Sequence, residues 1–241
     1  LASSAASDVY KRQLVFGCAK ADDGAFESNA VGEVNWSKVW YMDLGDDTCK
    51  KLAGWTHENV SLEVCGFKRY YLSDNPSQRC TFSLLATHLL DNSRAYNTTN
   101  TSVGGWASSK LNAFLNSRLY EAMPNQIKLL LKKVTVASSI GNLSTEISTS
   151  DCYITIPAAI EVSNESTINT EPYTNEGSTI SYMISDEKRK RAYVGGDYAS
   201  YWLRSPNASY ANYIYQVEAT GTLYGFANAY NKAGVLIEIS F

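Results

Sequence analysis

The chain of 241 residues is poor in the side chains on which most catalytic and metal sites depend. It has two histidines, His57 and His88. His57 precedes Glu58 in an expected loop, and His88 lies among leucines, where a lone histidine is more often a satisfied core residue than a base. No G-x-S-x-G elbow, phosphate-binding glycine loop or EF-hand loop occurs. We therefore predict that the protein is not an enzyme, needs no cofactor and has no metal ion at its functional site.

Cysteine is also scarce, and its arrangement excludes the usual zinc motifs. The five cysteines are odd in number and widely spaced, without a C-x-x-C pair or a Cys/His cluster. We expect most of them to be buried thiols, and one disulfide remains the alternative for an exported chain. They are Cys18, Cys49, Cys65, Cys80 and Cys152.

Charge is low and slightly acidic, at 19% charged residues and a net charge of −3. Nucleic-acid binding needs a basic stripe, and the sequence has none. Its one basic cluster, 188–191, follows Asp186 and Glu187, and we interpret it as a solvated loop. The sequence also lacks a run of about 18 apolar residues, so no transmembrane segment is predicted.

The first residues, 1–13, read LASSAASDVYKRQ and have no apolar core of a signal peptide. They resemble translated adapter sequence at the ends of metagenomic gene predictions, so we exclude them from the fold. This leaves open whether the natural N-terminus is present, and with it the localisation. We predict one domain over 14–241, which is long enough to bury a real core.

Hydrophobic patterns favour an α+β fold, because helices are expected in the first half and strands dominate the second, without βαβ alternation. Helices are predicted over 82–90, from Ser108 or Ser109 to 119, over 126–133 and over 157–161. Strands are predicted over 15–18, 36–44, 60–72 with a break at Gly66, 134–137, 151–156, 201–204, 213–218, 222–226 and 235–240. Thr220 and Gly221 predict a hairpin turn.

The most unusual stretch is 207–231, which is built mainly from Tyr, Asn, Ala, Ser, Thr and Gly and has a single charged residue, Glu218. Tyrosine offers a large contact area with few rotatable bonds, and Asn, Ser and Gly offer adaptable hydrogen bonds, as in antibody loops. We interpret Ile214, Val217 and Leu223 as packing residues and the tyrosines as a binding surface. The alternative is that the tyrosines are packing residues too.

Short motifs in the second half carry a resemblance to a known family. Trp202–Pro206 (WLRSP), the Tyr/Asn-rich stretch, Gly221 and a Gly234-Val235 step into a last strand resemble the C-terminal part of C-type-lectin-fold domains. More closely, they look like variable proteins of diversity-generating retroelements, in the branch related to the formylglycine-generating enzyme. Upstream, 106–116 is similar to the W-x-x-S-x-L-x-x-F-L-N helix, and 151–161 to a later piece, of a domain of unknown function common in bacterial surface proteins.

The resemblance implies a C-type lectin-like fold of short antiparallel strands, about two helices and long irregular loops, with a variable region at about 201–234. In such retroelements the adenines of a template are miscopied, which varies Asn-type codons without yielding Trp, Gln, Glu, Lys or Met. Trp202, Gln216, Glu218, Lys232 and Glu238 would then be fixed scaffold. The implied variable, ligand-binding positions are Asn207, Ala208, Ser209, Tyr210, Ala211, Asn212, Tyr213, Tyr215, Thr222, Tyr224, Phe226, Asn228 and Tyr230.

The resemblance implies a bacterial or phage protein, at a cell surface or on a virion, that binds a protein or glycan ligand on another cell or virus. One alternative is a surface or adhesion domain of the same fold without variation. Another is a formylglycine-generating-type enzyme, but that enzyme has paired late cysteines, whereas the last cysteine here is Cys152. The tail has only Glu218 and Glu238 as carboxylates, so a calcium-dependent sugar site is not expected there, and a structural calcium elsewhere stays open.

Overall fold

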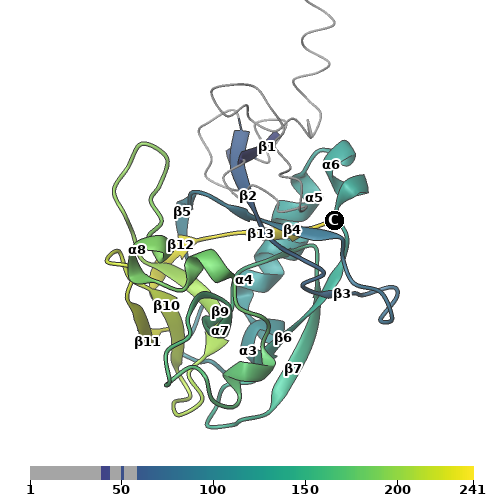
Figure 1. Ribbon diagram of the computed structural model, residues 1–241. Coiled ribbons are helices and arrows are strands. Elements are labelled where there is room, and N and C mark those ends of the chain that lie inside the picture. Colours follow the sequence, from purple (N-terminus) through teal and green to yellow (C-terminus); the bar gives the residue numbers. More distant parts are fainter. Residues whose placement is uncertain (1–38, 44–49, 52–58) are drawn as a thin grey trace, which may run out of the picture.

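The computed structural model describes residues 39–43, 50–51 and 59–241, and these form an α+β fold of short, mostly antiparallel strands (Figure 1). A first sheet has the order β1 (Val39–Asp43), β2 (Asn59–Phe67), β4 (Phe82–Ala86), β13 (Glu238–Ser240), β8 (Ile154–Thr155). A second has the order β11 (Leu223–Asn228), β10 (Tyr213–Val217), β9 (Tyr201–Pro206), β12 (Lys232–Val235), β5 (Leu90–Ala95). A third joins β3 (Tyr71–Leu72), β6 (Val134–Ser139) and β7 (Ile147–Cys152).

Helices connect the sheets, and the longest helical stretch confirms the helix predicted to begin at Ser108 or Ser109. After α3 (Gly105–Ser108), the Ser109 hydroxyl accepts a hydrogen bond from the Asn112 N–H at 3.0 Å and caps α4. The stretch then runs through α4 (Lys110–Ala113), the π-helical η1 (Phe114–Leu119) and α5 (Tyr120–Ala122). The shorter elements are α6 (Asn125–Leu130), α7 (Ala159–Val162), η2 (Tyr173–Asn175), η3 (Ser181–Met183) and α8 (Asp186–Arg189).

The helix predicted over 82–90 is wrong, because these residues form β4 and the start of β5. Strand β4 lies between β2 and β13, and its residues from 83 to 86 are all buried. A strand covered on both faces is apolar throughout, so its pattern resembles a buried helix. The turn between the strands leaves His88 half-buried rather than in the core.

The last strand predicted, 235–240, is in fact two strands that belong to different sheets. Strand β12 pairs with β5 and β9 in the second sheet, and β13 pairs with β4 and β8 in the first. The residues between them, Leu236 and Ile237, are fully buried. The chain end therefore ties two sheets together. Of the other predictions, 1–13, the strand over 15–18, Cys18, Cys49 and His57 lie outside the described residues.

The basic cluster 188–191 is not a solvated loop, because two of its four side chains are buried. Arg189 donates hydrogen bonds to the carbonyl oxygens of Gly221 (2.8 Å) and Val162 (2.9 Å). Arg191 pairs with Glu63 at 2.8 Å. The partners of Arg189 in these bonds are main-chain carbonyls, which have no signature in the sequence.

A buried cluster of two arginines and two glutamates joins the three sheets. Arg204 on β9 pairs with Glu161 on α7 at 2.7 Å, and both side chains are fully buried. Arg69 pairs with the other oxygen of Glu161 at 2.8 Å and with Glu238 on β13 at 3.0 Å. Arg204 also donates to the carbonyl oxygen of Ala137 on β6 at 3.0 Å. One charge-balanced cluster thus touches all three sheets.

The cluster also sets the ionisation of its members. Burial opposes the charge on Glu161, but the guanidinium groups of Arg204 and Arg69 outweigh it and hold the pKa of Glu161 below its usual value. The Tyr70 hydroxyl lies 2.9 Å from Glu161 and 3.0 Å from Glu238 and links the two carboxylates. Glu161 therefore stays ionised within the core.

Arg204→Met should lower the free energy of unfolding by roughly 3–5 kcal/mol, because it leaves the Glu161 carboxylate buried beside one arginine instead of two. Urea unfolding measures the change. Arg118→Met removes an exposed arginine and should change the free energy by less than about 0.5 kcal/mol. Equal effects of the two substitutions would show that the buried cluster does not hold the fold together.

Candidate functional site

The candidate site is built on the hairpin of β10 and β11, where β11 is the edge of the second sheet (Figure 1, lower left). The predicted turn is confirmed: the Gly221 N–H donates to the Glu218 carbonyl (2.8 Å), and the Glu218 N–H donates to the Thr222 carbonyl (2.9 Å). Gly221 has φ +89° and approaches the main chain of Asp186 so closely that a Cβ would collide with it. The turn is thus fixed against α8.

A β-bulge changes the pairing in the middle of this hairpin. Ile214 pairs with Ala227 and Gln216 pairs with Tyr224, so Gly225 and Phe226 together lie opposite Tyr215. Such bulges redirect side chains locally. At the bulge, the exposed side chains of Tyr224 and Phe226 and the half-buried side chain of Tyr215 come close together in the sheet.

Four aromatic rings meet on the outside of the hairpin, and we call them the aromatic surface: Tyr210, Tyr213, Tyr224 and Phe226. The ring of Phe226 lies 5.5 Å from Tyr210, 5.7 Å from Tyr213 and 6.0 Å from Tyr224, and all three contacts are tilted or edge-on. Tyr210, Tyr224 and Phe226 are 45, 40 and 48% exposed. Such contacts are favourable and hold the rings against one another, while Tyr210, Tyr224 and Phe226 stay exposed and Tyr213 is half-buried.

Tyr215 supports this surface from beneath. Its ring packs edge-on against Tyr173 with 5.2 Å between centroids. A Cβ at the buried Gly225 would come within 2.7 Å of the Tyr215 ring, so glycine is required for this close packing. The Tyr173 hydroxyl in turn accepts a hydrogen bond from the Ala208 N–H at 2.9 Å. Tyr215 is half-buried and contributes packing more than accessible area.

Asn207 is a structural tie and not an accessible contact residue. Its side chain is buried, donates to the Gly225 carbonyl at 2.7 Å and accepts from the Ser209 N–H at 2.9 Å. Its own N–H donates to the Tyr213 carbonyl at 2.9 Å. The asparagine thereby holds the start of the β9–β10 loop to both strands of the hairpin.

The remaining predicted positions lie around the aromatic surface. Asn228 accepts hydrogen bonds from the side chains of Asn100 (3.0 Å) and Asn212 (3.4 Å). Ser102 holds the loop from the other side, since its N–H donates to the Ala211 carbonyl at 2.8 Å. The exposed positions are Ser209, Thr222 and Tyr230, and the half-buried ones are Ala208, Ala211, Asn212 and Asn228.

The residues expected to be fixed scaffold differ in their burial. Trp202 and Glu238 are fully buried, whereas Gln216 and Glu218 are half-buried and Lys232 is exposed. Burial gives a physical reason to expect that the first two are fixed. Nothing in the structure explains why Lys232 should be fixed.

Glu176 connects the support of the aromatic surface to the buried charges. Its carboxylate accepts the Ser139 N–H at 2.7 Å and contacts the Ser205 hydroxyl, and its carbonyl contacts the Arg204 guanidinium. It follows η2, which carries Tyr173. Burial raises the pKa of Glu176 to about 7, against the effect of the Ser139 and Ser205 hydrogen bonds and the Arg204 charge.

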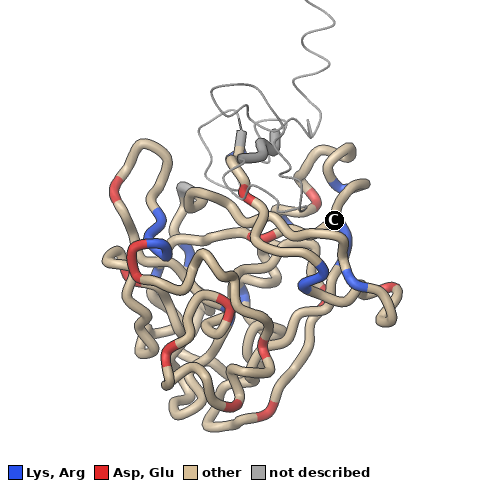
Figure 2. Tube along the Cα trace, in the orientation of Figure 1, with Lys and Arg blue, Asp and Glu red and all other residues tan. Residues whose placement is uncertain are grey.

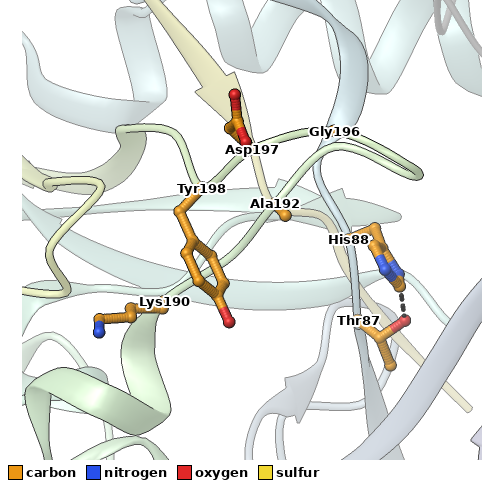
Figure 3. Close-up of a pocket in the computed structure, with 7 residues that line it drawn as sticks. All are labelled: Thr87, His88, Lys190, Ala192, Gly196, Asp197 and Tyr198. Carbon is orange, nitrogen blue, oxygen red and sulfur yellow. Dashed lines mark hydrogen bonds between the residues drawn. The ribbon is translucent and has the colours of Figure 1, made fainter.

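Away from the aromatic surface, the protein has a hollow of about 470 Å³ (Figure 3). The sequence did not predict it, because its lining comes from two distant segments, 87–88 and 190–198. His88 Nδ1 lies 2.9 Å from the Thr87 hydroxyl, and Lys190 pairs with the exposed Glu187 at 2.6 Å. In Figure 3 the side chains of Lys190, Asp197 and His88 point in different directions. The hollow is polar, but its charged groups do not converge on a shared point.

The described residues offer no metal-binding cluster of three or more His, Cys, Asp or Glu side chains. Cys65, Cys80 and Cys152 are buried thiols outside any disulfide. Burial raises the pKa of Cys152, so its thiol stays protonated and is a poor nucleophile. Within the same part of the chain, no helix has the length and apolar character needed to cross a membrane.

Comparison with known proteins identifies the family but no activity. The model of the family described as "Domain of unknown function (DUF6273)" matches residues 81–236, and the chain belongs to this family. The matched range contains the helical stretch from α3 to α6, the hairpin of β10 and β11, and Arg204. We found no significant match among curated proteins and none among solved structures.

Replacement of Glu176 by Gln should change how stability depends on pH. The Glu176 pKa is about 7 in the fold and near 4.5 when unfolded, so the stability contributed by the neutral carboxyl is complete below pH 4.5 and is lost as the pH rises through 7. A glutamine cannot ionise. Relative to wild type, the variant should therefore gain up to about 3 kcal/mol between pH 4.5 and about pH 8.

Urea unfolding at a series of pH values measures this difference, and Glu146→Gln, at an exposed position, is the control. Parallel pH profiles for wild type and Glu176→Gln would contradict the prediction, because they would show that folding does not raise the pKa of Glu176.

Proposed function

We propose that the protein is a ligand-binding, receptor-type domain whose contact surface is the aromatic surface and the loop residues around it. The observation that carries the proposal is the meeting of four aromatic rings, three of them exposed, on an edge hairpin and the β9–β10 loop beside it, which are anchored to a buried frame. The short antiparallel strands, the few helices and the long loops are compatible with the C-type lectin-like fold that the motifs imply.

The physical basis of binding would be that of other aromatic-rich recognition surfaces. Rings that already pack on one another lose little side-chain entropy on binding, so more of the contact energy appears as affinity. The neighbouring Ser209, Asn212 and Thr222 supply hydrogen-bonding groups. Since Glu218 is the single charged residue in 207–231, affinity would come from apolar contact and hydrogen bonds more than from charge. An uncharged surface of a protein or a glycan on another cell or virus fits these properties.

We further propose that the exposed positions are the targets of adenine-directed retroelement mutagenesis. Exposed side chains can be exchanged with little effect on stability, which is the property that a diversified surface needs. The structure separates the implied positions by this criterion. Tyr210, Tyr224, Phe226 and Tyr230 are suited to exchange, whereas Asn207 and Tyr215 carry structural contacts and should vary least.

The two alternatives have less support. A surface domain without variation would need the tyrosines for packing, and this description fits Tyr215 but not the accessible rings of Tyr210 and Tyr224. A formylglycine-generating-type enzyme would need reactive cysteines, and Cys152 is a buried, protonated thiol.

Sequencing the DNA around the coding region tests the diversification directly. We expect a reverse transcriptase nearby, and a near-copy of the segment that encodes 201–234. The differences between the two copies should fall at adenines and mainly in the codons of the exposed positions. A near-copy that differs equally at other bases, or the lack of any copy beside the complete locus, would rule out this mechanism.

A further inference from the structure

Helix α6 exposes apolar side chains at the far side of the molecule from the aromatic surface. Leu129 is 83% exposed and Leu130 is 39% exposed, although Ile127 and Leu131 beside them are buried. A single exposed leucine is ordinary on a protein surface. Two adjacent ones at the end of a helix, one of them almost fully exposed, form a small apolar projection.

Lysines surround this projection. Lys132 and Lys133 follow it directly and are exposed. Lys128 precedes it, is half-buried and donates a hydrogen bond to the Glu121 carbonyl at 3.0 Å. The Lys132 N–H donates to the Ser240 carbonyl at 2.8 Å, which places this segment beside the last strand. In Figure 2, Lys and Arg lie near the marked C-terminus, with Asp and Glu residues among them.

A pair of tyrosines lies between two of these lysines. The rings of Tyr120 and Tyr153 stack in parallel, 4.0 Å apart. Lys128 Nζ lies 6.0 Å from the centre of the first ring, and Lys133 Nζ lies 5.8 Å from the centre of the second. Two acids lie nearby: Asp151 accepts a hydrogen bond from Thr135 at 2.8 Å, and Glu121 on α5 is exposed.

We propose that this region, the α6 corner, docks on the surface of an anionic lipid bilayer. Leucines enter the boundary of the acyl chains, tyrosines favour the interface, and lysines are attracted by anionic headgroups. The corner combines all three around one point. The exposed Lys132 and Lys133 favour an anionic bilayer over an apolar protein groove, because a groove of that kind would leave their two ammonium groups without anionic partners.

The orientation that follows is suited to display. In Figure 1 the α6 corner lies at the upper right and the β10–β11 hairpin at the lower left. Docking through α6 would turn the aromatic surface away from the bilayer. The docking itself does not rest on the proposed ligand binding, and either can be present without the other.

Co-sedimentation of the full chain with lipid vesicles tests the proposal. The protein should bind vesicles of phosphatidylcholine mixed with phosphatidylglycerol, weakly and reversibly, and should be released by salt. It should bind vesicles of phosphatidylcholine alone much less. Each of Lys132→Gln and Lys133→Gln should lower the partition coefficient about five-fold. Leu129→Ser with Leu130→Ser should lower it about ten-fold or more, because the apolar insertion is lost.

Matched substitutions elsewhere serve as controls. Leu143→Ser removes a leucine that is 70% exposed in the turn before β7, and Lys188→Gln removes an exposed lysine on α8. Neither should change the partition coefficient, and circular dichroism should show all variants folded. Equal binding to both kinds of vesicle, no binding to either, or equal losses in the controls would overturn the proposal.

Discussion

The pairing of Arg204 with Glu161 is the interaction on which the rest of the structure depends. Both groups are fully removed from water, and desolvation of two charges is offset only if the geometry and the surrounding hydrogen bonds are complete. A complete set of partners here requires Arg69, Glu238 and the Ala137 carbonyl on β6, so the three sheets must be assembled together. The cluster therefore specifies one arrangement of the sheets more than it adds net stability.

The same cluster determines what the hairpin of β10 and β11 is free to do. Strand β9 carries Arg204 at its centre and is buried along its length, so β10 and β11 are held on a rigid neighbour. Asn207 and Gly225 fix the loop and the bulge that follow. Ile214, Val217 and Ala227 face the core, whereas Tyr210, Tyr224 and Phe226 are exposed, and the identity of these exposed side chains matters little to the frame. A stable interior and an exchangeable exterior thus lie within one short segment of chain.

Local patterns predicted the elements that local physics controls, such as the capped helix after Ser109 and the hairpin turn at Gly221. They failed where long-range contacts decide. Strand β4 looks helical because both its faces are covered, and Arg189 looks solvated because its partners are carbonyls. At the site, composition indicated an accessible aromatic group, and the structure contains one. Composition could not distinguish Asn207 and Tyr215, which have structural roles, from the exposed positions around them. Their burial depends on contacts with Gly225 and Tyr173.

A scan of all single substitutions over 201–241, displayed on cells and sorted by resistance to protease, tests most directly the claim that a fixed frame carries an exchangeable surface. We expect Tyr210, Thr222, Tyr224, Phe226 and Tyr230 to accept most amino acids without loss of resistance. Arg204, Ser205, Asn207 and Glu238 should accept almost none. Similar tolerance in the two groups, or intolerance at the exposed rings, would contradict the account.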